Sequence, residues 1–357
     1  MRRLATVWLG AAAMAAMAGE PPKEADQAAR IAKLCKELGE TQYGSMPAFE
    51  QLVQIGAPAV PKLLEALKDR RPQARWWAVA AVCRLAPDEG YAPVLDVLKN
   101  DSDDFVRSTA VYHLRHYGKK GKDIWPAVEE ALTDKSPEVG RWALRLMMED
   151  GCPKFDDAMR KTLASGGSEL RSYALEYVRT QFEKDTAKAK AYEPLVQQLL
   201  SAPDPLVRCD AIHTTVKMKD KGQLDFLREM YKTNPDARVK EAALRCVTVV
   251  PNPPVEALEF FIQGMESDNE KVREAAFKLI TKGVKEYIGF DAKGPVPMRE
   301  ATVAKWRQWL AANRDKLTWH SDVRKFLRPE DRPAKADEKG GKSPAKAADT
   351  PRKAPTP

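Results

Sequence analysis

Histidine is scarce in this sequence, with four residues among 357, and the common motifs of enzyme active sites are missing. There is no Gly-x-Ser-x-Gly, no phosphate-binding glycine loop and no His-Glu-x-x-His. Acid–base or triad chemistry built on histidine therefore has little to draw on. His113 and His116 have a spacing that a metal can use, but no Cys, Asp or Glu completes a set nearby. The register of His113 predicts packing instead, and we expect no catalytic residues, no cofactor and no metal.

Cysteine is also sparse, and the five cysteines are too far apart to form a Cys-x-x-Cys pair. Three of them, Cys83, Cys209 and Cys246, fall in expected helices, where cysteine usually behaves as a small buried hydrophobic residue. A structural disulfide is the alternative, and its connectivity cannot be read from the sequence.

Long apolar runs are absent except at the N-terminus. Arg2 and Arg3 precede a short apolar run over residues 4–14, and a small-x-small sequence then leads to Gly19. This order predicts a signal peptide over residues 1–18, and therefore an exported protein, periplasmic or extracellular. The run is too short to span a bilayer when flanked in this way, although an uncleaved anchor helix is the alternative. No other stretch is apolar enough to span a membrane.

The formal net charge of +8 is concentrated at the two ends of the chain. The two N-terminal arginines and the lysine-rich segment over residues 332–357 carry most of the excess, so the body between them is nearly neutral. A neutral body argues against a phosphate-binding surface, and we expect no nucleic-acid partner.

What the sequence does contain is one helical pattern repeated seven times. Each copy has an apolar residue, an alanine four positions later, and a third residue eight positions after the first that is apolar in six of the seven copies. These three positions form one stripe of a helix. The anchor residue and alanine pairs are Ala74/Ala78, Val106/Ala110, Val139/Ala143, Leu170/Ala174, Val207/Ala211, Val239/Ala243 and Val272/Ala276. Because one helical hairpin cannot bury its apolar faces alone, the copies must stack on one another.

The regions outside the array have different patterns. We expect a linker and N-terminal capping helices over residues 19–56, before the array at 57–287. Residues 288–327 predict a rigid turn and capping helices that contain tryptophan, and residues 328–357 are rich in Pro, Ala and Lys with no apolar period. That composition is typical of a disordered tail.

The array resembles the HEAT repeat, in the short form found in many bacterial proteins and in phycobilin-lyase-like repeats. The most specific match is an acidic turn followed by Val-Arg at the start of the second helix, complete at Val106-Arg107, Val207-Arg208 and Val272-Arg273. The resemblance implies an all-α fold, a right-handed α-solenoid of about seven to eight helical hairpins with a C-terminal capping helix. It also implies that the second helices line the concave face, but no single function.

Two features of the second helices suggest a binding surface. Trp76 occupies a register that holds mostly polar residues in the other copies, so it either covers a gap or anchors an interface. Arg75, Arg107 and Arg141 lie in the same or neighbouring second helices and could rim that anchor. For the arginines that follow the anchor residue of each copy, the alternative is an ion pair with an aspartate of the preceding turn. Trp77 and Trp142 share the next register and are expected in the core.

Together these observations favour a non-catalytic scaffold or adaptor in the bacterial cell envelope, a monomer that binds a protein partner of unknown identity. The alternatives are a HEAT-like lyase or a DNA-glycosylase-type enzyme, or a helical accessory module of a larger exported enzyme.

Overall fold

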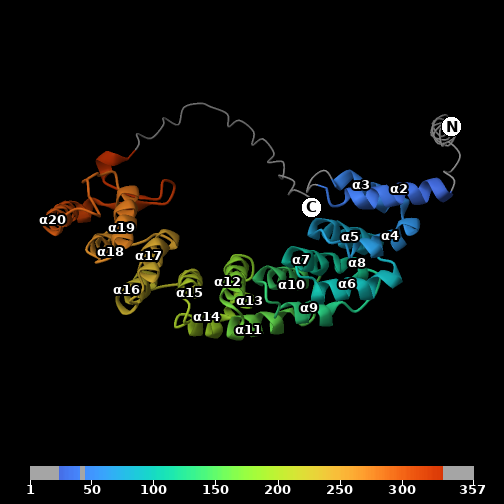
Figure 1. Ribbon diagram of the computed structural model, residues 1–357. Helices are drawn as coiled ribbons and strands as arrows, with labels where there is room; N and C mark the ends of the chain where they lie inside the picture. The colour runs from blue at the N-terminus through green and yellow to red at the C-terminus, as the bar shows by residue number, and fades with distance from the viewer. Residues whose placement is uncertain (1–23, 41–44, 333–357) are drawn as a thin grey trace, which may run out of the picture. The chain divides into compact units, whose positions relative to one another are not determined.

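The computed structural model describes residues 24–40 and 45–332, which are mostly helical (Figure 1). The chain divides into two compact units, residues 1–221 and residues 222–357. The expected signal peptide and most of the expected tail lie outside the described residues. No helix in the described part is long and apolar enough to cross a membrane.

The first unit is built from helical hairpins that follow one another along the chain. Its elements are α2 (Glu24–Glu37), α3 (Met46–Ile55), η1 (Ala57–Ala59), α4 (Val60–Ala66), α5 (Pro72–Leu85), α6 (Asp88–Asn100), α7 (Asp104–His113), α8 (Arg115–Gly118), α9 (Trp125–Ala131), α10 (Pro137–Glu149), α11 (Phe155–Ser165), α12 (Ser168–Phe182), α13 (Thr186–Lys190), α14 (Glu193–Leu199) and α15 (Pro205–Met218). The second helices pack in series, α5 on α7, α7 on α10, α10 on α12 and α12 on α15.

The second unit continues the pattern and ends in a small hairpin. Its elements are α16 (Gln223–Thr233), α17 (Ala237–Cys246), η2 (Val247–Val249), α18 (Glu256–Met265), α19 (Glu270–Gly283), α20 (Val296–Asn313), η3 (Arg314–Lys316), β1 (Thr318–His320), β2 (Lys325–Leu327) and η4 (Pro329–Asp331). The two strands are antiparallel, with Trp319 opposite Phe326.

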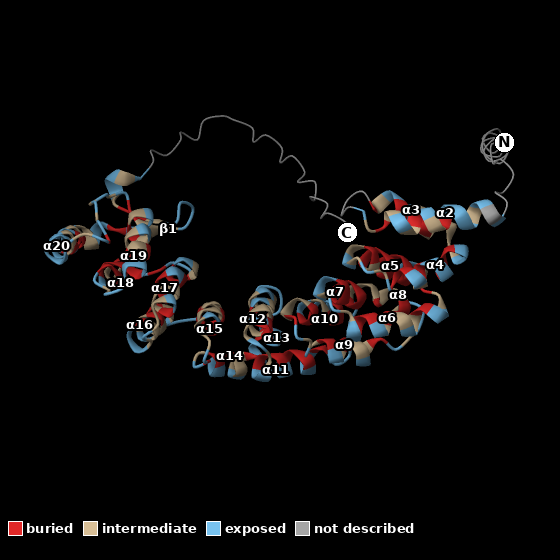
Figure 2. Ribbon diagram, viewed as in Figure 1, coloured by how far each residue is buried: buried red, intermediate tan, exposed pale blue. Residues whose placement is uncertain are grey.

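The core follows the repeated stripe of the second helices (Figure 2). All seven anchor residues are buried, and each alanine four positions later is completely buried. An alanine at this position lets neighbouring helices approach closely, and in the first unit the repeats share one core that runs from Ile31 to Met218. The prediction of an all-α solenoid is confirmed.

The turns between helices explain where the second helices begin. Asp103 is the N-cap of α7, and its carboxylate accepts hydrogen bonds from the backbone N–H groups of Phe105 and Val106. Asp204, Asp236 and Asn269 cap later second helices in the same way.

The C-terminal region is less helical than expected. Residues 288–327 contain one α-helix, α20, whose Val303, Trp306 and Leu310 are buried as the stripe predicts, but the segment then forms the β1–β2 hairpin. Ordered structure also passes the expected tail boundary at residue 328. Arg328 donates a hydrogen bond to Asp331, and Lys285 donates to the carbonyl oxygen of Asp331. These contacts hold the segment as far as Arg332, which is the last described residue.

Candidate functional site

Two of the four candidate binding residues, Arg75 and Arg107, are structural. The Nε and Nη2 atoms of Arg75 donate to the two carboxylate oxygens of Asp101 at 2.7 Å, and Arg107 binds Asp134 in the same way at 2.8 Å. Their Nη1 atoms donate to backbone carbonyls of the preceding turn, at Asp69 and Asp101. The side chains of Arg75 and Arg107 are only 11% and 2% exposed, so neither guanidinium is presented to a partner as an open cation.

Each arginine therefore joins its own repeat to the next one, so the pairs Arg75–Asp101 and Arg107–Asp134 link three successive repeats. We call these two pairs the clamp. The sequence suggested a carboxylate from the preceding turn, but the structure shows that the preceding turn supplies only its carbonyl and the following turn supplies the carboxylate. The physical reason is the length of the side chain. An extended arginine in the first turn of one second helix can reach the turn that precedes the second helix of the next repeat. Burial opposes ionisation of Asp101, but hydrogen bonds from Arg75 and from the backbone of Asp103 outweigh it, so the pKa of Asp101 is lowered.

The clamp is incomplete from the third copy onward. Gly140 replaces the arginine in α10, and a Cβ at this position would lie 3.1 Å from the side chain of Leu170 in α12, which is a tight contact. Arg171 donates to the carbonyl oxygen of Ala164, but its Nε is buried without a hydrogen-bond partner in the described residues. The turn that would supply its carboxylate carries Ala202 at that position.

Trp76 is not an exposed anchor, because only 6% of it is accessible. Its ring lies between Trp77, at a centroid distance of 4.3 Å, and Phe105 of α7, at 5.4 Å. Trp77 is fully buried and reaches Phe49 of α3 at 5.1 Å. The register of Trp76 is indeed unusual, and the ring of Phe105 from the next repeat covers it.

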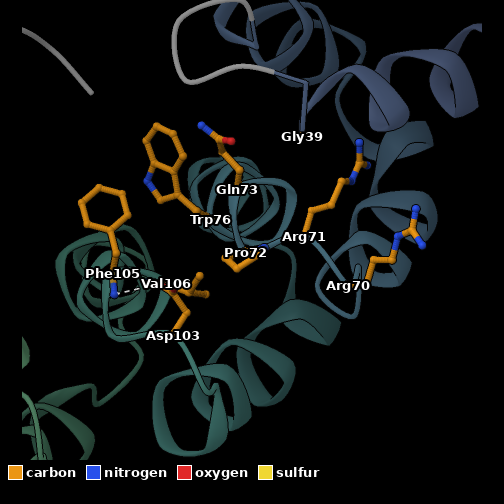
Figure 3. Close-up of a pocket in the computed structure, with 9 residues that line it drawn as sticks. All are labelled: Gly39, Arg70, Arg71, Pro72, Gln73, Trp76, Asp103, Phe105 and Val106. Atoms are coloured by element: carbon orange, nitrogen blue, oxygen red, sulfur yellow. Dashed lines mark hydrogen bonds between the residues drawn. The ribbon is translucent and has the colours of Figure 1, made fainter.

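The exposed aromatic residue at this place is Phe105, which is 51% accessible. It shares with Trp76 the wall of a pocket of about 740 Å³ between the N-terminal ends of α5 and α7 (Figure 3). The pocket is lined by Gly39, Arg70, Arg71, Pro72, Gln73, Trp76, Asp103, Phe105 and Val106. In Figure 3 the two aromatic rings lie on one side of α5, and the two arginines lie on the other. The volume is in the range that small ligands and side-chain anchors occupy.

Arg141 does not belong to this pocket. It is exposed on α10, donates to Glu138 at 2.8 Å, and lies over the ring of Tyr173 of α12 at 5.3 Å. Of the four candidates, then, only Trp76 lines the pocket.

A row of aromatic residues continues over α7, α10 and α12, and the sequence analysis missed it. Tyr112 and Trp142 make an edge contact at 5.0 Å, and Arg145 lies over Trp142 at 4.9 Å. Trp142 is half-buried, contrary to the expected core position. The reason is that its indole N–H donates to Glu138 at the surface, and its ring packs on Tyr112. The half-buried position of Trp142 could have been predicted by comparing side-chain sizes at this register, because the neighbouring helix α7 has the smaller Thr109 there.

Burial shifts the pKa values of two titratable residues outside this region, His113 and Cys35. Burial, with His116, Arg115 and Arg84 nearby, lowers the pKa of His113 to about 3, so its imidazole is neutral and a weak base at pH 7. Burial raises the pKa of Cys35 to about 11. None of the five cysteines forms a disulfide, and no group of three metal-ligating side chains occurs in the described part of the chain.

The comparison with protein families agrees with the repeat architecture. The family model for HEAT repeats matches residues 23–115 and 169–248, and no curated protein sequence matches the chain. Among solved structures, YibA from E. coli is 18% identical with a TM-score of 0.41, and the match covers 74% of this chain and 98% of YibA. The CpcE–CpcF complex of phycocyanin lyase from Nostoc is 14% identical at 0.30, with 70% and 94% covered. Importin beta is 15% identical at 0.43, with 76% and 42% covered. At these values the structural likeness carries no inference about function.

Proposed function

We propose that this chain, which is a HEAT-repeat protein, is a non-catalytic scaffold that binds another protein through the pocket between α5 and α7. The observation that carries the proposal is the half-exposed Phe105 ring, which extends the buried Trp76–Trp77 stack to the surface at that pocket. Apolar anchors in concave sites of this kind contribute most of the affinity at protein interfaces.

The aromatic row supports a binding surface wider than the pocket. Tyr112, Trp142 and Tyr173 lie on successive second helices, and each ring has an arginine side chain over it. Arginine and aromatic residues are enriched at interfaces, and both have large side chains that can cover a wide area of a partner. A partner seated in the pocket could therefore extend along α7, α10 and α12.

The absence of catalysis is part of the proposal. It is supported by the raised pKa of Cys35 and the lowered pKa of His113, which leave neither residue as an active nucleophile or base at pH 7. We further propose that the protein acts as a monomer after export, in the periplasm or outside the cell. The basic and apolar pattern of residues 1–18 supports that location.

The experiment compares two substitutions at the same register. Phe105 and Leu206 both directly precede the anchor residue of a second helix, and both are exposed, at 51% and 56%. Purified wild-type protein, Phe105→Ser and Leu206→Ser are immobilised and incubated with a cell-envelope extract, and the bound proteins are quantified by mass spectrometry. We expect Phe105→Ser to lose a partner that both wild type and Leu206→Ser retain.

Equal retention by all three proteins would contradict the proposed site. Trp76→Ser is a poorer variant for this purpose, because Trp76 is nearly buried and its loss would also destabilise α5.

A further inference from the structure

Two histidine rings stack at the junction between α7 and α8. The ring centres of His113, the last residue of α7, and His116, in α8, are 5.7 Å apart, and the angle between the ring planes is 15°. The Nδ1 atom of His113 is buried and has no hydrogen-bond partner in the described part of the chain. A protonated His113 would carry an N–H group at this atom, with neither water nor an acceptor to receive it.

The cations around this pair oppose its protonation further. Arg84, near the end of α5, and Arg115, in α8, act on both imidazoles, and Lys119, which follows α8, acts on His116. Burial is the largest cause of the lowered pKa of each histidine. For His113 the neighbouring His116, Arg115 and Arg84 add to that effect and bring its pKa to about 3.

The other groups that face the pair do not cancel this effect. Asp150, at the end of α10, favours protonation of His116, but the pKa of His116 is still lowered. Both carboxylate oxygens of Asp150 accept hydrogen bonds from Arg115, and Glu149 accepts one from the same guanidinium. From α7 itself, Tyr112 packs edge-on against His113 at 5.1 Å, so this helix contributes an aromatic ring there and no carboxylate.

Residues 115–122, which we call the latch, are held on α5 and α6 by a small number of contacts. Tyr117 is 1% exposed, and its ring lies 5.1 Å from that of Tyr91 in α6. Lys120 donates to the carbonyl oxygens of Leu85 and Ala86 at the end of α5, both at 2.9 Å. Since α7 ends at His113 and α8 begins at Arg115, the latch is joined to α7 by a turn and not by continuous helix.

We infer that the latch is acid-sensitive: it stays closed on α5 while His113 and His116 are neutral, and it opens when they take up protons. Opening moves His116, Arg115 and Lys119 away from His113 and gives the N–H groups of its imidazolium access to water. The inference does not depend on the proposed function.

The direction of the pH dependence follows from the lowered pKa values of the closed form. Above the ordinary histidine pKa of about 6.5, both forms are neutral and the latch is unaffected. Below it, the open form binds more protons than the closed form, so the closed form is progressively disfavoured as the pH falls toward the lowered values. Arg115 lies over the ring of Tyr112 at 4.9 Å, so opening also uncovers the first ring of the aromatic row.

Hydrogen exchange of backbone amides in the full-length protein, at about pH 7.5 and about pH 5.5, tests the latch. Protection factors, corrected for the pH dependence of intrinsic exchange, report the opening equilibrium of residues 115–122. A histidine pKa of about 3 in the closed form and about 6.5 in the open form raises that equilibrium constant about tenfold over this interval. Carboxylates of ordinary pKa, about 4, stay mostly ionised at both values, so they contribute little to the change.

His113→Leu removes the buried titrating group. Leucine occupies the same register in α10 and α19, at Leu146 and Leu279, so it suits this position. His213→Leu is the matched control, because His213 is another half-buried histidine of a second helix in the same unit, on α15. Melting temperatures verify that both variants are folded.

We expect wild type and His213→Leu to lose about tenfold in protection over residues 115–122 at the lower pH. His113→Leu should lose less, and His113→Leu combined with His116→Gln should lose none. Unchanged protection of these residues in wild type, or an equal loss in wild type and His113→Leu, would overturn the inference. So would an equal loss over α5, α7 and the latch, because protonation would then unfold the unit as a whole.

Discussion

Removing the carboxylate of Asp134 tests the clamp that joins the repeats. Arg107 is 1% exposed and binds Asp134 through two hydrogen bonds of 2.8 Å, so Asp134→Ala leaves a buried guanidinium without its counterion. Breaking a buried pair by removing one partner costs about 3–5 kcal/mol, which for a unit of this size lowers the melting temperature by roughly 6 °C or more. The control is Glu130→Ala, which breaks the exposed pair with Lys99, and an exposed pair of this kind is worth about 1 kcal/mol or less.

The assay is thermal and urea unfolding followed by far-ultraviolet circular dichroism and tryptophan fluorescence. If Asp134→Ala and Glu130→Ala change stability equally and by little, Arg107 is not held as a buried clamp, and the reasoning fails.

The pH dependence of the free energy of unfolding gives a second readout. The folded-state pKa values of Asp101 and Asp134 are both lowered, so their stabilisation is present above the ordinary aspartate pKa. It is lost as the pH falls through the lowered values, and Asp134→Ala should flatten that acid loss.

Two other substitutions and one sequencing experiment have defined expectations. Ala110→Asp should unfold several repeats together, because Ala110 is completely buried between neighbouring helices, and an unchanged melting temperature would show that this position is not core. Ala202→Asp should raise the melting temperature by supplying Arg171 with the carboxylate that its earlier counterparts have, whereas a lowered melting temperature would mean that the turn cannot accommodate it. The exported form should begin at about Gly19 by N-terminal sequencing, and intact Met1 in a membrane fraction would count against the signal peptide.

The sequence was enough to place the core of the second helices. The apolar anchor, the alanine four positions later and the residue eight positions later are one helix stripe, and a stripe of this kind can only face the interior. Val106, Ala110 and Leu114, for example, are all completely buried in the structure. Repetition made the prediction strong, because each copy tests the register of the others.

The candidate site was harder to predict, because its properties depend on contacts between neighbouring repeats. Phe105 and Leu206 occupy the same register, and only the structure shows that Phe105 lies against Trp76 and closes one side of a pocket. The clamp on Arg107 likewise depends on which turn its side chain reaches, and a single sequence does not specify that direction. The β1–β2 hairpin was missed because its strands have only three residues each.

The most direct test of the proposed function is hydrogen exchange of the protein with and without a peptide whose binding depends on Phe105. We expect the peptide to slow exchange of backbone amides in residues 70–76 and 103–108, where the pocket is, and to leave residues 204–210 unchanged. Slowed exchange confined to residues away from the pocket would contradict the claim that this protein binds its partner between α5 and α7.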